Sequence, residues 1–227
     1  MAVAAAALAL AALAATPLAA QTAPSAAQAA RYTGLHAAAW RGDPAALQQA
    51  LGAKANVNTR DDQGRTPLHV ATFAKQRDAI RALARAGAQL GALENDRYDA
   101  VTIAAVANDE DSLRVLLELG ASAMLTTSRY DGTALIAAAH LGHDGVVRQL
   151  IGAGAPLDHV NNLHWTALIE SIVLGDGGPR HVATLRALVD AGASTKLTDR
   201  EGRTPLVLAQ SRGYAEMVRI LQQAGAR

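Results

Sequence analysis

The sequence predicts an all-α solenoid of about six helix–turn–helix units with projecting β-hairpin loops. Short motifs recur about every 33 residues, and the composition suits a thin, repeated core. Hydrophobic residues make up 50% of the 227 residues, yet aromatic residues make up only 3%. Much of the apolar fraction is alanine, which favours helix but buries little surface per residue. The core is therefore expected to be spread along the chain.

A Thr-Pro-Leu-His motif at residues 66–69 and five relatives of it mark the repeats. The first positions of successive copies are separated by 33, 33, 34, 33 and 38 residues. A Gly-Ala pair closes each of the last five copies, 21 residues after the first position of the copy, except in the fifth copy, where the separation is 26 residues. The copies begin at Thr33, Thr66, Asp99, Thr133, Thr166 and Thr204.

Each copy contains signals for two helices and a hairpin, in that order. The threonine is a helix cap, and proline after it fits the first helical position. A short turn containing glycine follows, and the second helix carries larger apolar residues such as Val147 and Leu150. The closing glycine suits the left-handed conformation that ends a helix. A polar segment such as residues 59–65 then forms a hairpin that leads to the next copy.

These markers, in phase over six units, resemble the ankyrin-repeat family across residues 33–227. The resemblance implies L-shaped helix pairs stacked side by side, stabilised by contacts between neighbouring repeats. Five residues replace expected glycines, so repeats two and three are expected to be less regular. The replacements are Lys54, Lys75, Arg97, Asn108 and His164. The expected repeats span residues 33–65, 66–98, 99–132, 133–165, 166–203 and 204–227, after a mature N-terminal segment at 21–32.

Residues 1–20 have the pattern of a secretory signal peptide. An uncharged apolar run at 2–15 is followed by Thr16 and Pro17, and small residues precede Gln21 as in a cleavage site. No Lys or Arg precedes the run, which leaves the true start codon open, and a disordered alanine-rich tail is the alternative. A membrane anchor is disfavoured because the run is shorter than the ~20 residues that span a bilayer. We therefore expect a bacterial protein that is periplasmic or secreted.

The charge balance and the absence of cysteine exclude several functions. The formal net charge is +1, from 21 basic and 20 acidic residues, which gives no basic footprint for nucleic acid. With no cysteine, the chain can form neither disulfides nor thiolate metal sites. We expect a monomer with no cofactor and no membrane span after the leader is removed.

The fifth copy contains five extra residues within 175–181. Three glycines and a proline there predict a loop and not a longer helix. The loop is not a phosphate loop, since it lacks the Gly-Lys-Ser/Thr ending and follows a helix. It is either a tolerated surface insertion or a loop that contacts a partner. Its candidate contact residues are Asp176, Gly177, Gly178 and Arg180.

The resemblance implies that a partner binds at the hairpin tips and on the inner face of the first helices. Most aromatic residues of this aromatic-poor chain map by register to that concave side. Large rigid aromatic side chains are frequent anchors of interfaces, although several of these can instead pack on neighbouring hairpins. The candidate partner-binding residues are Trp40, Phe73, Tyr98, Tyr130, His140, Leu141, Trp165, Val173 and Leu174.

Five of the seven histidines lie between residues 140 and 181, which raises the rival hypothesis of a metal-dependent enzyme. Their spacing matches no ligand pattern, and the family uses the positions of His36, His69 and His143 to join repeats. Glu170 stands at a usually apolar position, so a buried Glu170 needs a partner, for which Arg180 or His181 is expected. We identify no catalytic residue and no metal ligand.

The sequence therefore predicts a non-catalytic protein–protein interaction module. The family association points to a role in stress defence. An inhibitor or immunity protein of a toxin or hydrolase is the first alternative, and a metal-dependent enzyme that uses repeats four and five is the second.

Overall fold

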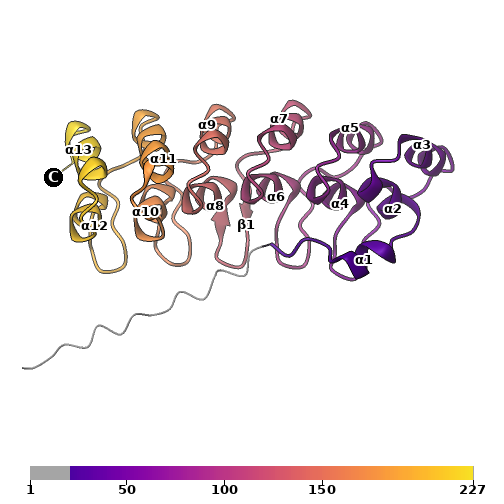
Figure 1. The fold of residues 1–227 in the computed structure, drawn as a ribbon, viewed down its shortest axis with the longest axis horizontal. Helices are drawn as coiled ribbons and strands as arrows, with labels where there is room; N and C mark the ends of the chain where they lie inside the picture. The colour runs from indigo at the N-terminus through magenta and orange to yellow at the C-terminus, as the bar shows by residue number, and fades with distance from the viewer. Residues whose placement is uncertain (1–20, 227) are drawn as a thin grey trace, which may run out of the picture.

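The computed structural model describes residues 21–226, so the expected signal peptide at 1–20 lies outside it. Helix pairs stand side by side in a single file (Figure 1). The elements are α1 (Ala26–Ala30), α2 (Gly34–Arg41), α3 (Pro44–Gly52), α4 (Pro67–Phe73), α5 (Arg77–Arg85), α6 (Ala100–Val106), α7 (Glu110–Glu118), β1 (Thr126–Thr127), β2 (Gly132–Thr133), α8 (Ala134–His140), α9 (Asp144–Gly152), α10 (Ala167–Val173), α11 (Pro179–Asp190), α12 (Pro205–Ser211) and α13 (Ala215–Gln223).

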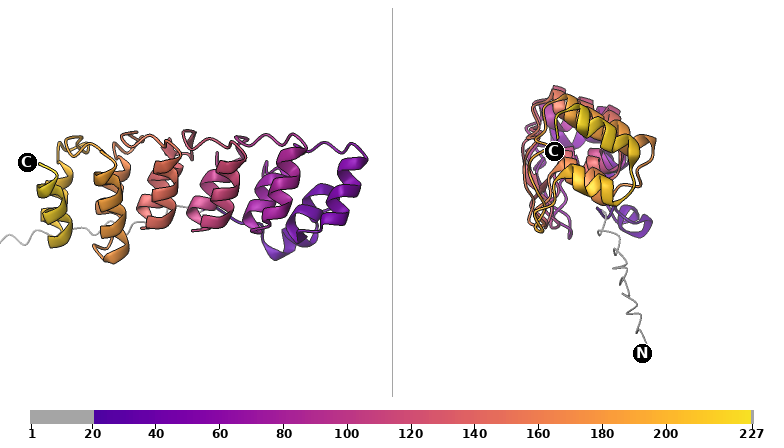
Figure 2. Two further views of the ribbon diagram at one scale, coloured as in Figure 1. Left: turned by 90° about the horizontal axis from the view of Figure 1, so that it is seen from above. Right: turned by 90° about the vertical axis from the view of Figure 1, so that its left-hand side faces the viewer.

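The pairs from α2–α3 to α12–α13 are repeats one to six. The second helices form one row, the first helices form a row beneath it, and the hairpin loops project below the first helices (Figures 1 and 2). We call the side formed by the first helices and the hairpins the concave face. The hairpin before α8 contains two paired strands, with Thr126 opposite Thr133 and Thr127 opposite Gly132. This arrangement confirms the predicted solenoid.

Each first helix begins directly after the residue that marks the start of its repeat in the sequence. Asp99 Oδ1 accepts a hydrogen bond from the Thr102 amide at 2.8 Å, and Thr166 Oγ1 accepts one from the Ile169 amide at 3.2 Å. Pro67 opens α4, where its missing N–H removes no hydrogen bond. The motif therefore acts locally, by capping the helix that it precedes.

The core is continuous along the stack and is thin in each repeat. Leu68, Leu135 and Leu168 occupy the same position in repeats two, four and five and are buried among alanines of both helix rows. Each helix packs against its own partner and against the equivalent helix of the next repeat. None of the helices within residues 21–226 has the length and hydropathy that would cross a bilayer.

Residues that replace the expected glycines adopt the backbone of glycine. The φ angles of Lys54, Lys75 and Asn108 are 58°, 55° and 50°, and those of Arg97 and His164 are 67° and 63°. The prediction that repeats two and three are less regular is wrong, because their helices have 7 and 9 residues, as do those of repeat four. The repeat geometry is maintained at the expense of local strain, since left-handed backbone is unfavourable for residues with a side chain.

Lys75→Gly should therefore raise the free energy of unfolding by about 1 kcal/mol, since glycine adopts positive φ without strain. Chemical denaturation monitored by circular dichroism measures the change. Lys196→Gly is the matched control, because Lys196 has no positive φ and the glycine there should destabilise the fold. Equal shifts for the two variants would show that Lys75 bears no strain.

The extra residues of repeat five lengthen both a loop and a helix, so the prediction of a loop alone is wrong. Helix α11 has 12 residues, where the second helix of repeat four has 9. Gly178 is its N-cap and Pro179 its first residue, a position where the fixed φ of proline favours a helix start. Pro179 thus begins the helix three residues early instead of prolonging the loop.

Candidate functional site

A side-chain oxygen located five residues before the next repeat folds most of the hairpins. Asp61 Oδ1 accepts hydrogen bonds from the amides of Gln63 and Arg65 at 2.9 and 2.8 Å. Glu94, Asn161 and Asp199 accept the same pair of bonds in their own hairpins. The sequence analysis missed this position, although Asp, Glu or Asn recurs there in register. These bonds fix the hairpin tips of the concave face.

A second series of hydrogen bonds joins the turns of repeats two, four, five and six to the preceding repeats. We call them turn contacts: a side chain just before or in the first turn of a second helix donates to a carbonyl near the end of the preceding repeat's first helix. The donors and acceptors are Gln76 Nε2 and Trp40 O (3.4 Å), His143 Nδ1 and Ala105 O (3.0 Å), His181 Nε2 and His140 O (2.9 Å), and Tyr214 Oη and Gly175 O (2.8 Å). Repeat three has Asp109 at this position, which accepts from the Ser112 amide instead.

The concave face of repeats three to five contains an open cavity of about 390 Å³. Its lining is mostly apolar, and its polar side chains include Thr102, Asn161 and Glu170. Four of the predicted partner-binding residues line it together, namely Tyr98, Tyr130, His140 and Leu141. Leu141 is 37% exposed, whereas Tyr98 is only 9% exposed. The cavity is thus lined by side chains from repeats two to five and by Gln21.

The other five predicted residues do not line this cavity. Trp40, Trp165 and Val173 are half-buried against the core. The Phe73 ring lies below the Arg65 guanidinium, with 5.7 Å from Cζ to the ring centroid. Leu174 caps the end of α10 and is half-buried. Their proposed contact with a partner stays a prediction.

Glu170 is 3% exposed, and its partners differ from those expected. Asn161 Nδ2 donates to Glu170 Oε1 at 2.8 Å, and His140 Nδ1 lies 3.6 Å from Oε2. The expected partners, Arg180 and His181, make other contacts, since Arg180 Nε donates to Gly142 O at 3.2 Å. Both lie in the first turn of α11, which directs them to the turn of repeat four.

The inserted loop is folded onto its neighbouring repeats. Asp176 Oδ1 accepts from the Gly178 amide at 2.8 Å and lies 2.8 Å from His181 Nδ1. These two contacts lower the pKa of Asp176, and the hydrogen bond from the Gly178 amide has the larger effect. A Cβ atom on Gly177 would lie 2.4 Å from the Tyr214 ring, so the loop backbone packs closely on repeat six.

The histidines of repeats four and five make separate structural contacts. His143 and His181 form turn contacts, and His159 Nε2 donates to Asp131 O at 2.6 Å. Within the described part of the chain, no three side chains of His, Asp or Glu lie close enough together to hold a metal ion.

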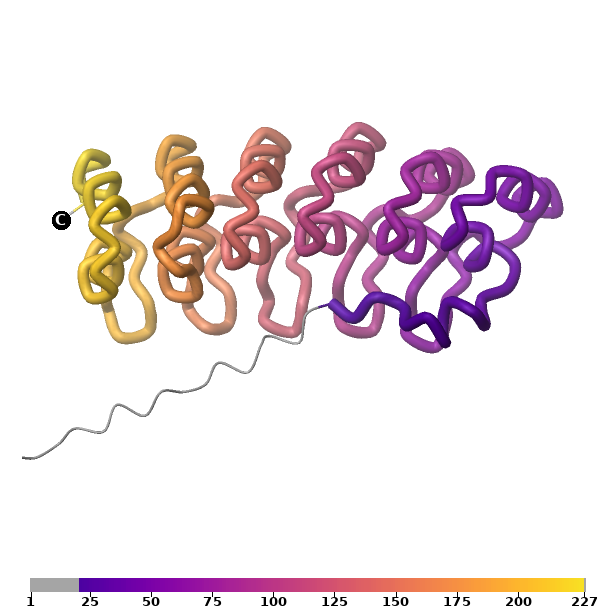
Figure 3. The backbone as a smooth tube through the Cα atoms, viewed as in Figure 1, coloured from indigo at the N-terminus to yellow at the C-terminus, as the bar shows by residue number. Residues whose placement is uncertain are grey.

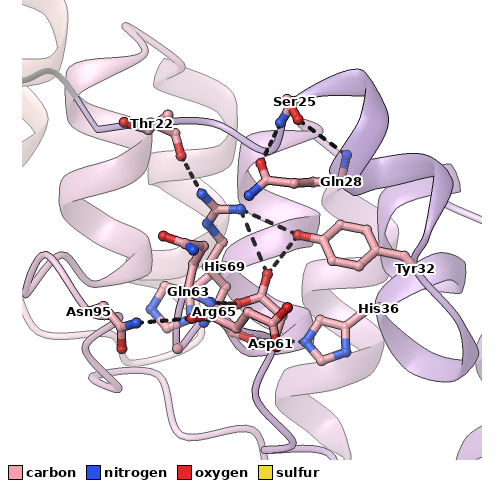
Figure 4. A network of polar contacts seen from close by, with 12 residues as sticks. Thr22, Ser25, Gln28, Tyr32, His36, Asp61, Gln63, Arg65, His69 and Asn95 are labelled. Carbon is pink, nitrogen blue, oxygen red and sulfur yellow. Dashed lines mark hydrogen bonds and ion pairs between the residues drawn. The ribbon is translucent and has the colours of Figure 1, made fainter.

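The N-terminal segment, residues 21–32, folds back along the concave face toward β1 (Figure 3). Arg65 anchors it and is only 3% exposed. Its Nη2 donates to the Thr22 carbonyl at 2.8 Å, and its Nη1 lies 3.7 Å from Asp61 Oδ2 (Figure 4). Tyr32 Oη donates to the same Asp61 oxygen at 2.8 Å. Beyond Thr22, Gln21 reaches the cavity and forms part of its lining.

Comparisons with known proteins agree on one family. The family model described as ankyrin repeats (3 copies) matches residues 35–127, and the model described as ankyrin repeat matches 130–162 and 201–227. The ankyrin repeat protein YahD of Escherichia coli (strain K12) is 40% identical over 100 residues, which cover 44% of this chain and 50% of YahD. An ankyrin repeat-containing protein of Treponema pallidum (strain Nichols) is 36% identical over 107 residues, which cover 46% of this chain and 34% of that protein. The chain thus spans about half the length of YahD and about a third of the length of the Treponema pallidum protein.

Solved structures share most of this arrangement. The crystal structure of an ankyrin repeat domain from Acinetobacter baumannii AYE has a TM-score of 0.81 and 41% identity, and the match covers 85% of this chain and 98% of that one. The ankyrin repeat domain of Bcl-3, described as a unique member of the IkappaB protein family, has a TM-score of 0.76 and 26% identity, covering 87% of this chain and 88% of that one.

Proposed function

Since the chain belongs to the ankyrin-repeat family, we propose that it binds a partner protein through its concave face and hairpin tips, without catalysis. Ankyrin-repeat proteins are generally non-enzymatic binding modules. The observation that carries the proposal is the open cavity of repeats three to five, where Tyr98, Tyr130, His140 and Leu141 meet. Aromatic and apolar side chains in a preformed concavity are suited to anchor a partner.

The framework around this cavity is cross-linked by backbone hydrogen bonds, which favours tight binding. The hairpins are joined to one another by backbone bonds, such as Asn162 N to Tyr130 O at 3.0 Å and Ser128 N to Arg97 O at 2.9 Å. Preorganised side chains lose little conformational entropy when a partner binds.

The partner is a protein of the stress response, or a toxin or hydrolase that the chain inhibits, and its identification separates these classes.

The proposed location is the periplasm or the cell exterior, after removal of residues 1–20. The support is the apolar run and the small residues before Gln21. Sequencing the N-terminus of the protein purified from its source organism tests this. A mature chain that begins at Gln21 agrees with export, and a retained leader contradicts it.

Leu141→Glu should weaken partner capture by about tenfold or more, since it places an unpaired charge in the proposed interface. The measurement is quantitative affinity capture from an extract of the source organism, with immobilised wild type beside the variant. Leu141 is 37% exposed, so the substitution should leave the thermal unfolding curve unchanged.

Val207→Glu is the matched control. Val207 is 43% exposed on α12, at the far end of the solenoid from α1, and it is not part of the cavity. It should capture the same protein as the wild type. Equal capture by the wild type and Leu141→Glu would show that the cavity is not the binding site.

A further inference from the structure

Glu170 is a buried carboxylate whose side-chain hydrogen-bond donor among the described residues is the neutral amide of Asn161. The equivalent positions of repeats two, three and four hold Val70, Ile103 and Ala137, so a small or apolar side chain suits the site. No Lys or Arg side chain of residues 21–226 forms an ion pair with Glu170. A buried carboxylate without a cationic partner is costly. The cavity therefore presents a negative charge that nothing in the described chain neutralises with a permanent cation.

The rest of the cavity suits the stem of a long cationic side chain. Val106, Ile136 and Leu141 supply apolar contact, and Tyr98 and Tyr130 supply aromatic rings. Lysine and arginine side chains pack their methylene stems on apolar surface, and their charged ends are attracted to aromatic rings. The basic groups among the lining residues are two imidazoles, His140 and His143. Burial lowers the pKa of His143, which favours the neutral ring, so His143 repels a bound cation only weakly.

The chain's own N-terminal segment shows that this part of the concave face takes an extended peptide. Arg65 binds the Thr22 carbonyl, and residues 21–24 run without helix along the concave face toward the cavity. Gln21 is an imperfect occupant, since its Nε2 is buried without a hydrogen-bond partner among the described residues. A buried donor without a partner is unfavourable, so a better-matched segment can displace it.

We propose that the cavity binds a lysine or arginine side chain on an extended segment of the partner protein, with Glu170 as its counter-charge. The inference rests on the proposed function and names the chemistry of the partner. Glu170, Tyr98 and Tyr130 set the preference for a basic residue, and the path of residues 21–24 marks where the partner backbone lies.

The test uses the full chain and a phage-displayed library of short random peptides. The selected peptides should share a Lys or Arg at one position. A synthetic selected peptide should bind about 30-fold more tightly than its analogue with norleucine in place of the basic residue, because norleucine keeps the stem and lacks the charge. Fluorescence anisotropy measures both affinities.

Glu170→Gln should remove this difference between the two peptides. Glutamine retains an oxygen that can accept from Asn161, so the fold should survive, which thermal unfolding checks. Glu118→Gln is the matched control, because Glu118 lies at the end of α7 with its side chain 57% exposed, outside the cavity. It should leave both affinities unchanged.

Three results would overturn the inference: no enrichment of peptides, enriched peptides without a shared basic residue, or a Glu170→Gln variant that still prefers the lysine peptide. The comparison of lysine and norleucine peptides on the wild type decides the matter even if the variant does not fold. Binding without a basic preference leaves the proposed function standing. That function fails separately, if Leu141→Glu captures the partner as the wild type does.

Discussion

Gly175→Ala should lower the free energy of unfolding by about 3 kcal/mol, the upper range for overpacking a well-packed site. A Cβ atom at Gly175 would lie 2.1 Å from the Ser171 carbonyl oxygen and 2.9 Å from His181 Cδ2. The carbonyl belongs to α10 and cannot move without distorting that helix. The displacement would also reach repeat six, since the Gly175 carbonyl accepts the turn contact from Tyr214. Urea denaturation measures the loss.

Gly152→Ala is the control for this prediction. Gly152 is the last residue of α9 and is exposed, and an added Cβ would meet no atom within 4 Å. Alanine there should stabilise the protein by about 0.5 kcal/mol, because it favours helix more than glycine does. If the two variants unfolded at the same urea concentration, the close packing at Gly175 would be refuted.

Lowering the pH from 7 to 4 should remove about 3 kcal/mol of stability through His69 alone. Burial lowers the pKa of His69 from 6.5 to about 4. The unfolded chain therefore takes up a proton on this ring at a higher pH than the folded chain does. The contribution is complete above pH 6.5 and is lost as the pH falls toward 4. In the folded state Nδ1 accepts from the Thr66 amide and Nε2 donates to Ala92 O, so a second ring proton breaks the first bond.

The measurement is the free energy of unfolding at several pH values for the wild type and for His69→Gln. Glutamine does not titrate. Between pH 7 and pH 4 the free energy of unfolding of the variant should therefore fall by about 3 kcal/mol less than that of the wild type, although the variant is less stable at pH 7. His164→Gln, in an exposed hairpin position, should keep the acid sensitivity of the wild type. An unchanged acid sensitivity in His69→Gln would contradict the assignment.

The features that the sequence could predict are those encoded by neighbouring residues. Helix starts at Thr66 or Asp99 depend on a cap and the three residues after it, and turns depend on a backbone conformation that recurs in phase. The residues that replace glycine also adopt the recurring backbone conformation, since Lys54 and Asn108 have positive φ. The prediction of irregularity failed because packing in the stack overrides the local preference of a single residue.

The features that could not be predicted depend on contacts between distant residues. The Glu170 partner is Asn161, from its own hairpin, because the early start of α11 directs Arg180 elsewhere. In the fold-back of the N-terminal segment, Arg65 bonds to the Thr22 carbonyl across 43 residues. Neither contact leaves a periodic trace in the sequence. Register alone predicts that Tyr98 and Leu141 lie on the same face, and both line the cavity.

The turn contacts have a direction along the chain. In each of them the donor lies in the later repeat and the carbonyl acceptor in the earlier one, as with His143 and Ala105. A chain that emerges with its N-terminus first, from the ribosome or across a membrane, therefore presents each acceptor before the matching donor. A later repeat can dock on a repeat that is already folded, so the solenoid is suited to assemble from its N-terminus, one repeat at a time.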